Sequence, residues 1–122
     1  MHAIDWFEIP ATDFDRAVTF YETVLAKALR REIFAGMQNA VLPYDGENGV
    51  GGAIVHGEHY LPAPHGPVVY LHVADLEEAV SRIPSAGGQV IMPPMSIGPN
   101  GTIAHIRDTE GNRVGLHQPA AH

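Results

Sequence analysis

The sequence contains an internal repeat whose period is about half of its 122 residues. The segment IPATDFDRAV (residues 9–18) aligns without gaps on LHVADLEEAV (residues 71–80), an offset of 62 positions (71 minus 9). Asp13 then falls on Asp75, and Val18 falls on Val80. A solenoid would need three or more copies, so the repeat predicts two copies of one structural module.

Each copy begins with a strand-like alternation and continues with a helix-like one. Phe7 and Ile9 alternate with their neighbours, as Leu71 and Val73 do in the second copy, and a period of two is typical of a strand with one buried face. An Asp that can cap a helix follows, with apolar residues at helical spacing after it. Three β-rich segments complete each copy, namely residues 29–34, 37–44 and 50–57, then 89–94, 102–107 and 113–118. The sequence therefore predicts an α+β fold of two βαβββ modules.

The Pro-rich segment HYLPAPHGP, residues 59–67, is the one credible boundary inside the chain. A chain of this length supports one compact domain rather than two ordinary ones. We predict a single domain over residues 1–122, with module one at about 1–58, a linker at about 59–67 and module two at about 68–122.

Composition excludes several classes of function. The absence of cysteine excludes disulfides and thiolate chemistry. The net charge of −7 and the lack of a Lys/Arg cluster argue against nucleic acid as a partner. No segment approaches the roughly 18 apolar residues of a membrane span, and the N-terminus lacks a secretory pattern. We expect a cytoplasmic protein that binds neither nucleic acid nor membrane.

Three segments resemble the vicinal oxygen chelate superfamily, which includes glyoxalase I, extradiol dioxygenases and the bleomycin resistance proteins. They are WFEIPATDFDRAVTFYETVL (residues 6–25), GPVVYLHVADLEEAV (residues 66–80) and DTEGNRVGL (residues 108–116). The resemblance covers nearly the whole chain. It implies paired modules whose mixed sheets curl around a cleft, and it implies a homodimer.

Metal-using members of that superfamily place one ligand on the first strand and one on the last strand of each module. The resemblance carries these positions to residues that have no donor side chain, namely Trp6, Gly51 or Gly52, Val68 or Val69, and Gly115. A divalent ion needs several converging N or O donors. We therefore expect no metal at the inherited site, and no cofactor.

Strand alternation predicts which side chains line the cleft. The residues expected to share its concave side are Trp6, Glu8, Tyr70, His72, Arg113, Gly115 and His117, with His105 joining them from the preceding strand. Aromatic, carboxylate and imidazole groups around a floor left open by glycine suit a small organic ligand. Each residue also has a structural interpretation, since glycine in a strand often marks a bend and Trp6 can be a core residue.

Three functions remain open at this stage. The first is a metal-free protein that binds a small organic molecule and sequesters it, as bleomycin resistance proteins do. The second is a lyase, isomerase or dioxygenase-like enzyme, in which Glu8 forms an acid–base pair with His72 or with Tyr70, or in which His72, His105 and His117 form a displaced metal site. The third is a scaffold whose cleft is collapsed.

Overall fold

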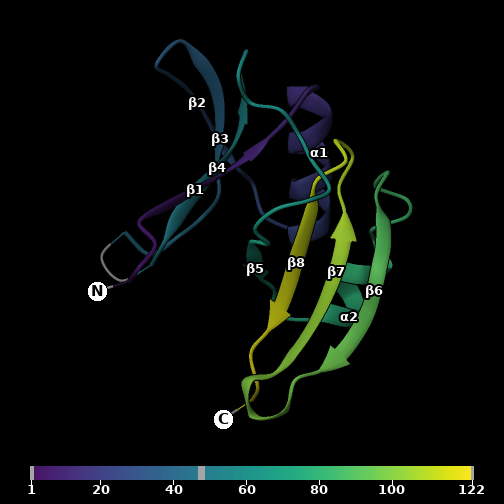
Figure 1. Ribbon diagram of the computed structural model, residues 1–122. Coiled ribbons are helices and arrows are strands. Elements are labelled where there is room, and N and C mark those ends of the chain that lie inside the picture. Colours follow the sequence, from purple (N-terminus) through teal and green to yellow (C-terminus); the bar gives the residue numbers. More distant parts are fainter. Residues whose placement is uncertain (1, 47–48, 122) are drawn as a thin grey trace.

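The computed structural model describes residues 2–46 and 49–121 (Figure 1). The elements of module one are β1 (Trp6–Pro10), α1 (Phe14–Leu25), β2 (Arg30–Phe34), β3 (Met37–Val41) and β4 (Gly51–His56). Those of module two are β5 (Tyr70–His72), α2 (Leu76–Ser81), β6 (Gln89–Ser96), β7 (Thr102–Arg107) and β8 (Arg113–Gln118), with a short 3-10 turn at Gly98–Asn100. The predicted βαβββ order is thus present twice.

The strands form two separate four-stranded sheets with the same topology. The first sheet has the order β1-β4-β3-β2 and the second has the order β5-β8-β7-β6. In each sheet the first and last strands of the module are parallel, and the other pairs are antiparallel. These mixed sheets confirm the predicted glyoxalase-like α+β fold. β5 has only three residues and is shorter than the alternation predicted.

Equivalent backbone hydrogen bonds occur at equivalent positions of the two modules. Ala11 N–H donates to the carbonyl of Val55 at 2.8 Å, and Val73 N–H donates to the carbonyl of His117 at 2.9 Å. Ala11 and Val73 are 62 positions apart, as are Val55 and His117, and this is the offset of the sequence repeat. The repeat is therefore a structural one, and a residue of one module identifies its counterpart in the other.

Both helices begin where the sequence predicts. The side chains of Asp13 and Asp75 accept hydrogen bonds from the backbone N–H groups of Arg16 and Glu78, which satisfies donors that the first helical turn leaves unpaired. The apolar stripe of α1 and the inward residues of both sheets form one core, in which Phe20, Ile54 and Leu116 are fully buried. In Figure 1 both helices lie behind the second sheet, α2 behind β6 and β7 and α1 behind β8, so they pack on the same side of it. Neither described helix is long and apolar enough to cross a bilayer.

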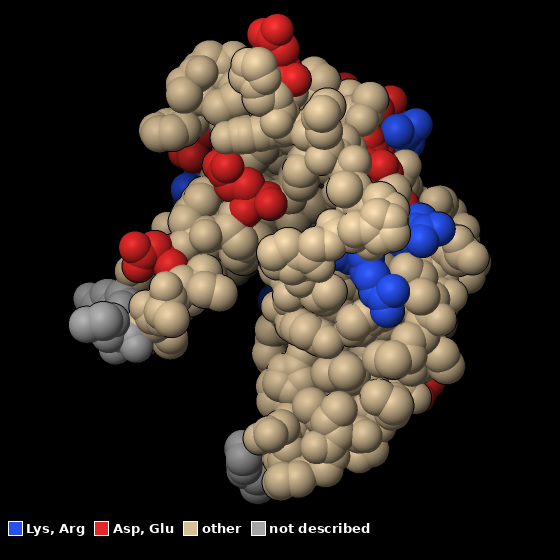
Figure 2. Space-filling view, viewed as in Figure 1, with Lys and Arg blue, Asp and Glu red and all other residues tan. Residues whose placement is uncertain are grey.

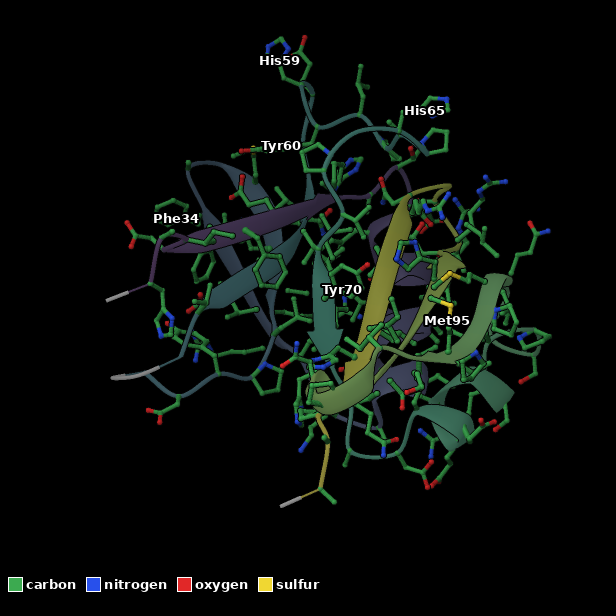
Figure 3. The ribbon with its side chains drawn as sticks, turned by 60° about the horizontal axis from the view of Figure 1, so that its bottom comes forward. Phe34, His59, Tyr60, His65, Tyr70 and Met95 are labelled. Atoms are coloured by element: carbon green, nitrogen blue, oxygen red, sulfur yellow. The ribbon has the colours of Figure 1, made fainter. Side chains whose placement is uncertain are left out.

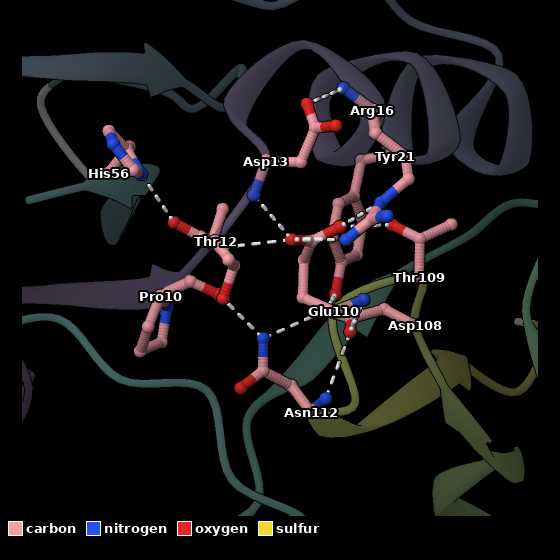
Figure 4. Close-up of polar contacts among 11 residues, drawn as sticks. Pro10, Thr12, Asp13, Arg16, Tyr21, His56, Asp108, Thr109, Glu110 and Asn112 are labelled. Atoms are coloured by element: carbon pink, nitrogen blue, oxygen red, sulfur yellow. Dashed lines mark hydrogen bonds and ion pairs between the residues drawn. The ribbon is translucent and has the colours of Figure 1, made fainter.

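A buried polar network fixes the β7–β8 turn against module one (Figure 4). The Asp108 carboxylate accepts hydrogen bonds from Tyr21 Oη at 2.6 Å and from the side-chain amide of Asn112 at 3.0 Å. The Asn112 amide also donates to the carbonyl of Pro10 at 2.7 Å. Glu110 accepts from the backbone N–H of Asp13 at 2.7 Å. The DTEGN turn thereby sets how β8 lies relative to β1 and α1.

A wide cleft separates the edge strands of the two sheets (Figure 2). β1 ends one sheet and β5 ends the other. Between them lies a mainly apolar cleft of about 840 Å³, with Ile4, Phe7 and Tyr44 on one wall and Val68 and Val69 on the other. Within one chain the two sheets therefore remain separate surfaces.

Candidate functional site

The site predicted in module two lies on the open face of the second sheet, by which we mean the face turned away from the helices. Residues paired across neighbouring strands point to the same side of a sheet. The register pairs Tyr70 with Gly115, His72 with His117, His105 with Gly115 and Arg107 with Arg113. Their neighbours Leu71, Ala104, Ile106 and Leu116 are buried on the helix side. Six predicted site residues thus share one face: Tyr70, His72, His105, Arg113, Gly115 and His117.

The ring of Tyr70 occupies the space above Gly115. A Cβ atom at position 115 would lie 2.4 Å from Cδ1 of Tyr70 and 2.5 Å from Cε1, far inside contact distance. The residue at the inherited ligand position therefore has to be glycine if Tyr70 keeps this place. The ring of Tyr70, on the neighbouring strand β5, fills the space that a side chain at position 115 would occupy.

Tyr70 is joined to two further side chains of the open face. Its hydroxyl lies 2.6 Å from Nε2 of His105, and the two rings meet edge to face at 66° with centroids 5.4 Å apart. On the other side of the imidazole, Nε of Arg113 donates to Nδ1 of His105 at 3.0 Å. Tyr70, His105 and Arg113 thus form one continuous chain of hydrogen bonds across β5, β7 and β8.

The environment of His105 favours its neutral form. Burial lowers the pKa of His105 below 6.5, and the nearby Arg113 guanidinium lowers it further because it repels the imidazolium. Neutral imidazole has one donor and one acceptor nitrogen. This is the state that can accept from Arg113 at one nitrogen and donate at the other.

Four further residues complete the open face and were not predicted from the sequence: Met92, Met95, Ile103 and Arg107. Met92 pairs with His105, Met95 pairs with Ile103, and Arg107 lies opposite Arg113. Figure 3 shows Tyr70 and Met95 as parts of the second sheet. Methionine side chains adapt to irregular apolar ligands, so the face joins a soft apolar surface to a cationic edge. Ile103 and Arg107 alternate with their neighbours along β7 as His105 does, so this alternation could have identified both of them.

Trp6 and Glu8 lie on the other sheet, so the structure does not bring the whole predicted set together. Trp6 is half-exposed, and its ring meets Tyr44 edge to face with centroids 6.1 Å apart. The Glu8 carboxylate lies close to Tyr60 of the linker and raises the pKa of Tyr60. Tyr60 also packs on a small buried cluster of Val41, Ala53 and Val55. The open face of the first sheet is therefore partly covered by the linker.

Glu8 and His72 line different pockets. Glu8 and Arg113 both border a small pocket of about 190 Å³ beneath the linker, together with Asn112 and His65. His72 borders the wide cleft between the sheets. The acid and base pair considered from the sequence would have to act across this separation, and the geometry within one chain does not favour it.

The residues present do not fit a metal at the inherited site or at a displaced one. The module repeat moves the counterpart of Gly115 from Gly51 or Gly52 to Ala53, because Glu8 pairs with Ala53 as Tyr70 pairs with Gly115. Gly51, Gly52, Ala53 and Gly115 have no donor side chain. Both ring nitrogens of His105 are engaged, and Nε2 of His117 lies 2.7 Å from the carbonyl of Asn100. Within residues 2–46 and 49–121, no three His, Asp or Glu side chains are grouped to hold an ion.

These features define the class of protein. The family model of the Glyoxalase/Bleomycin resistance protein/Dioxygenase superfamily matches residues 3–116, and the chain belongs to this superfamily.

Individual relatives are similar over most of this chain. A protein named "Putative glyoxylase CFP32" from Mycobacterium bovis is 30% identical over 130 residues, which cover 97% of this chain and 46% of the relative. The chain thus spans about half the length of that relative. TnmS3, an antibiotic binding protein from Streptomyces sp. CB03234, has a TM-score of 0.71 at 21% identity and covers 98% of both chains. A glyoxalase/bleomycin resistance protein from Albidiferax ferrireducens T118 has a TM-score of 0.74 at 12% identity, covering 98% of this chain and 100% of the other. At these identities the two structures support the fold alone.

Proposed function

We propose that this protein binds a small, largely planar organic molecule on the open face of the second sheet, without a metal at the inherited positions. Its role would be to sequester that molecule. The observation that carries the proposal is the Tyr70 ring over Gly115, since an aromatic hydrogen-bonding group stands where metal-using relatives place a metal ligand. A similar fold in an antibiotic binding protein is in keeping with this role.

The open faces of the two sheets offer complementary surfaces for a ligand held between them. The first sheet presents apolar side chains such as Trp6 and Phe34, and the second presents the polar chain of Tyr70 together with Met95. Because the sheets of one chain lie apart, we propose a homodimer in which the first sheet of one protomer covers the second sheet of its partner. Large exposed apolar side chains are typical of such interfaces.

A second candidate is a metal-independent enzyme acting at the same face. The observation that favours it is the 2.6 Å contact between Tyr70 and His105, because a phenol and an imidazole in hydrogen-bond contact can pass a proton. Sequestration differs from catalysis in one measurable respect, since a sequestered ligand is recovered unchanged.

The proposed function can be tested by equilibrium dialysis against a panel of planar aromatic ketones, quinones and phenols, with mass spectrometry as the readout. We expect the protein to retain a subset of the panel in unchanged form, and Tyr70→Phe to retain less of it. Retention of no compound by the parent protein would reject the binding function. Chemical conversion of a retained compound, lost in Tyr70→Phe, would establish the enzyme instead.

A further inference from the structure

Arg113 fixes the direction of every hydrogen bond in the chain of Tyr70, His105 and Arg113. A guanidinium nitrogen donates and cannot accept. Nδ1 of His105, which receives the 3.0 Å hydrogen bond from Arg113 Nε, must therefore carry a lone pair and no proton. The single proton of the neutral imidazole then resides on Nε2.

The proton on Nε2 of His105 determines the role of Tyr70 in their shared hydrogen bond. Nε2–H of His105 donates to the Tyr70 oxygen at 2.6 Å, so the phenol oxygen is the acceptor in this contact. The hydroxyl hydrogen of Tyr70 is then free for a second partner. Tyr70 is half-exposed, so that partner can be a molecule lying on the open face.

We propose that Tyr70 is a directed hydrogen-bond donor that selects ligands with an acceptor oxygen, namely the carbonyl of a planar ketone or quinone or the oxyanion of a phenolate. This inference rests on the proposed binding function and names its ligand class. The acceptor oxygen takes the Tyr70 hydroxyl hydrogen, while the planar body of the ligand lies against Met92 and Met95.

Charges on the open face favour the same class. Arg107 and Arg113 are directly opposite each other on β7 and β8, and like charges in this position repel. Four other arginines, Arg16, Arg30, Arg31 and Arg82, form ion pairs with carboxylates. Among the described residues Arg107 and Arg113 form no such pair. An electron-rich oxygen or a carboxylate on the ligand would relieve this repulsion.

The direction of the hydrogen bonds among Arg113, His105 and Tyr70 can be tested without any ligand. Nitrogen-15 NMR of the labelled protein at pH 7.5 reports which imidazole nitrogen of His105 is protonated, with His105→Gln for assignment. We expect protonation at Nε2 and a bare Nδ1. A proton on Nδ1 would overturn the proposal, because Tyr70 would then have to donate to His105.

The ligand class is tested with a matched pair of probes, 9-oxofluorene-2-carboxylate and fluorene-2-carboxylate, which differ by a carbonyl in place of a methylene. We expect the ketone to bind about two- to tenfold more tightly, as one added hydrogen bond allows. Tyr70→Phe should abolish this preference and bind both probes alike. Tyr44→Phe is the matched control, since residue Tyr44 is exposed to 45% against 46% for Tyr70.

Each outcome decides one question. A ketone preference that survives in Tyr70→Phe would overturn the proposal, because the selecting donor would be another group. Binding of neither probe would overturn the ligand class, while the dialysis panel still reports separately whether the protein binds small molecules at all. His105→Phe should reduce the ketone preference, because it removes the donor that orients Tyr70.

Discussion

The hydroxyl of Tyr21 on α1 donates a 2.6 Å hydrogen bond to the carboxylate of Asp108, 87 residues further along the chain. Both side chains are buried, and the contact joins the helix of module one to the last turn of module two. The stability of the arrangement between the modules therefore depends on this pair.

Tyr21→Phe should destabilise the protein by about 1.5 to 3 kcal/mol at pH 7, the range for hydrogen bonds to charged groups. Asp108 keeps its other donors, including the side chain of Asn112, so the loss should not exceed this range. Urea unfolding followed by circular dichroism measures the change, with Tyr44→Phe as the control at a half-exposed ring. A change below about 0.5 kcal/mol, a third of the smallest loss expected, would contradict the assigned role.

The same pair predicts a loss of stability in alkali. Burial, followed by the Asp108 carboxylate, holds the pKa of Tyr21 well above its ordinary value of 10.0. A raised pKa in the folded state means that its contribution is complete below pH 10.0 and is lost as the pH rises towards the folded value. The free energy of unfolding of the parent should fall above pH 10 more steeply than that of Tyr21→Phe. Parallel curves for the two proteins would show that Tyr21 does not titrate in this way.

Glu110 predicts the opposite behaviour in acid. Burial raises the pKa of Glu110, but hydrogen bonds from Arg16, the Asp13 N–H and Thr109 outweigh it and lower the pKa below 4.5. A lowered pKa means that the contribution is present above pH 4.5 and is lost as the pH falls through the folded value. Glu110→Gln should cost about 1 to 3 kcal/mol at pH 7, and its difference from the parent should shrink as the pH falls below 4.5. Glu32→Gln, at an exposed ion pair, should change stability by less than about 1 kcal/mol.

Gly115→Ala tests whether Tyr70 needs the empty space beneath it. The added methyl group cannot coexist with the observed ring position, so Tyr70 should swing into solvent and lose its contact with His105. Because Tyr70 is half-exposed, the melting temperature should change little, whereas the preference for the ketone probe should disappear. Gly46→Ala adds a methyl group into open space and serves as the control. A stability loss of about 1 to 3 kcal/mol would instead mean that the ring cannot move away.

The fold could be predicted from the sequence because its signals are local and repeated. Asp13 and Asp75 mark both helix starts, and the DTEGN turn marks the β7–β8 hairpin. Alternation along β5, β7 and β8 is enough to group Tyr70, His105 and Gly115 on one face, as the strand register does. Counting outward from the turn would also have paired His105 with Gly115.

The arrangement of the site could not be predicted in the same way. Alternation gives the face of a strand but not the placement of one sheet relative to another, so Trp6 and Tyr70 were expected on a common surface. The cover of Tyr60 over the first sheet depends on the path of the linker. Register shifts in β6 between Val90 and Met95 interrupt the alternation that would have placed Met92 and Met95.

The proposed dimer can be tested with two neighbouring residues on β2. Ile33 and Phe34 are exposed to 73% and 70% but point to opposite faces of the first sheet. Phe34 pairs with Met37, whose side chain packs on the open-face cluster, and Ile33 pairs with Gln38. If the open face is the dimer interface, Phe34→Glu should weaken association by about tenfold or more, since burial of a phenylalanine contributes about 1.5 to 3 kcal/mol. Ile33→Glu changes the charge equally and should leave the dimer intact. Sedimentation equilibrium of both variants measures the effect, and equal weakening by the two substitutions would place the interface elsewhere.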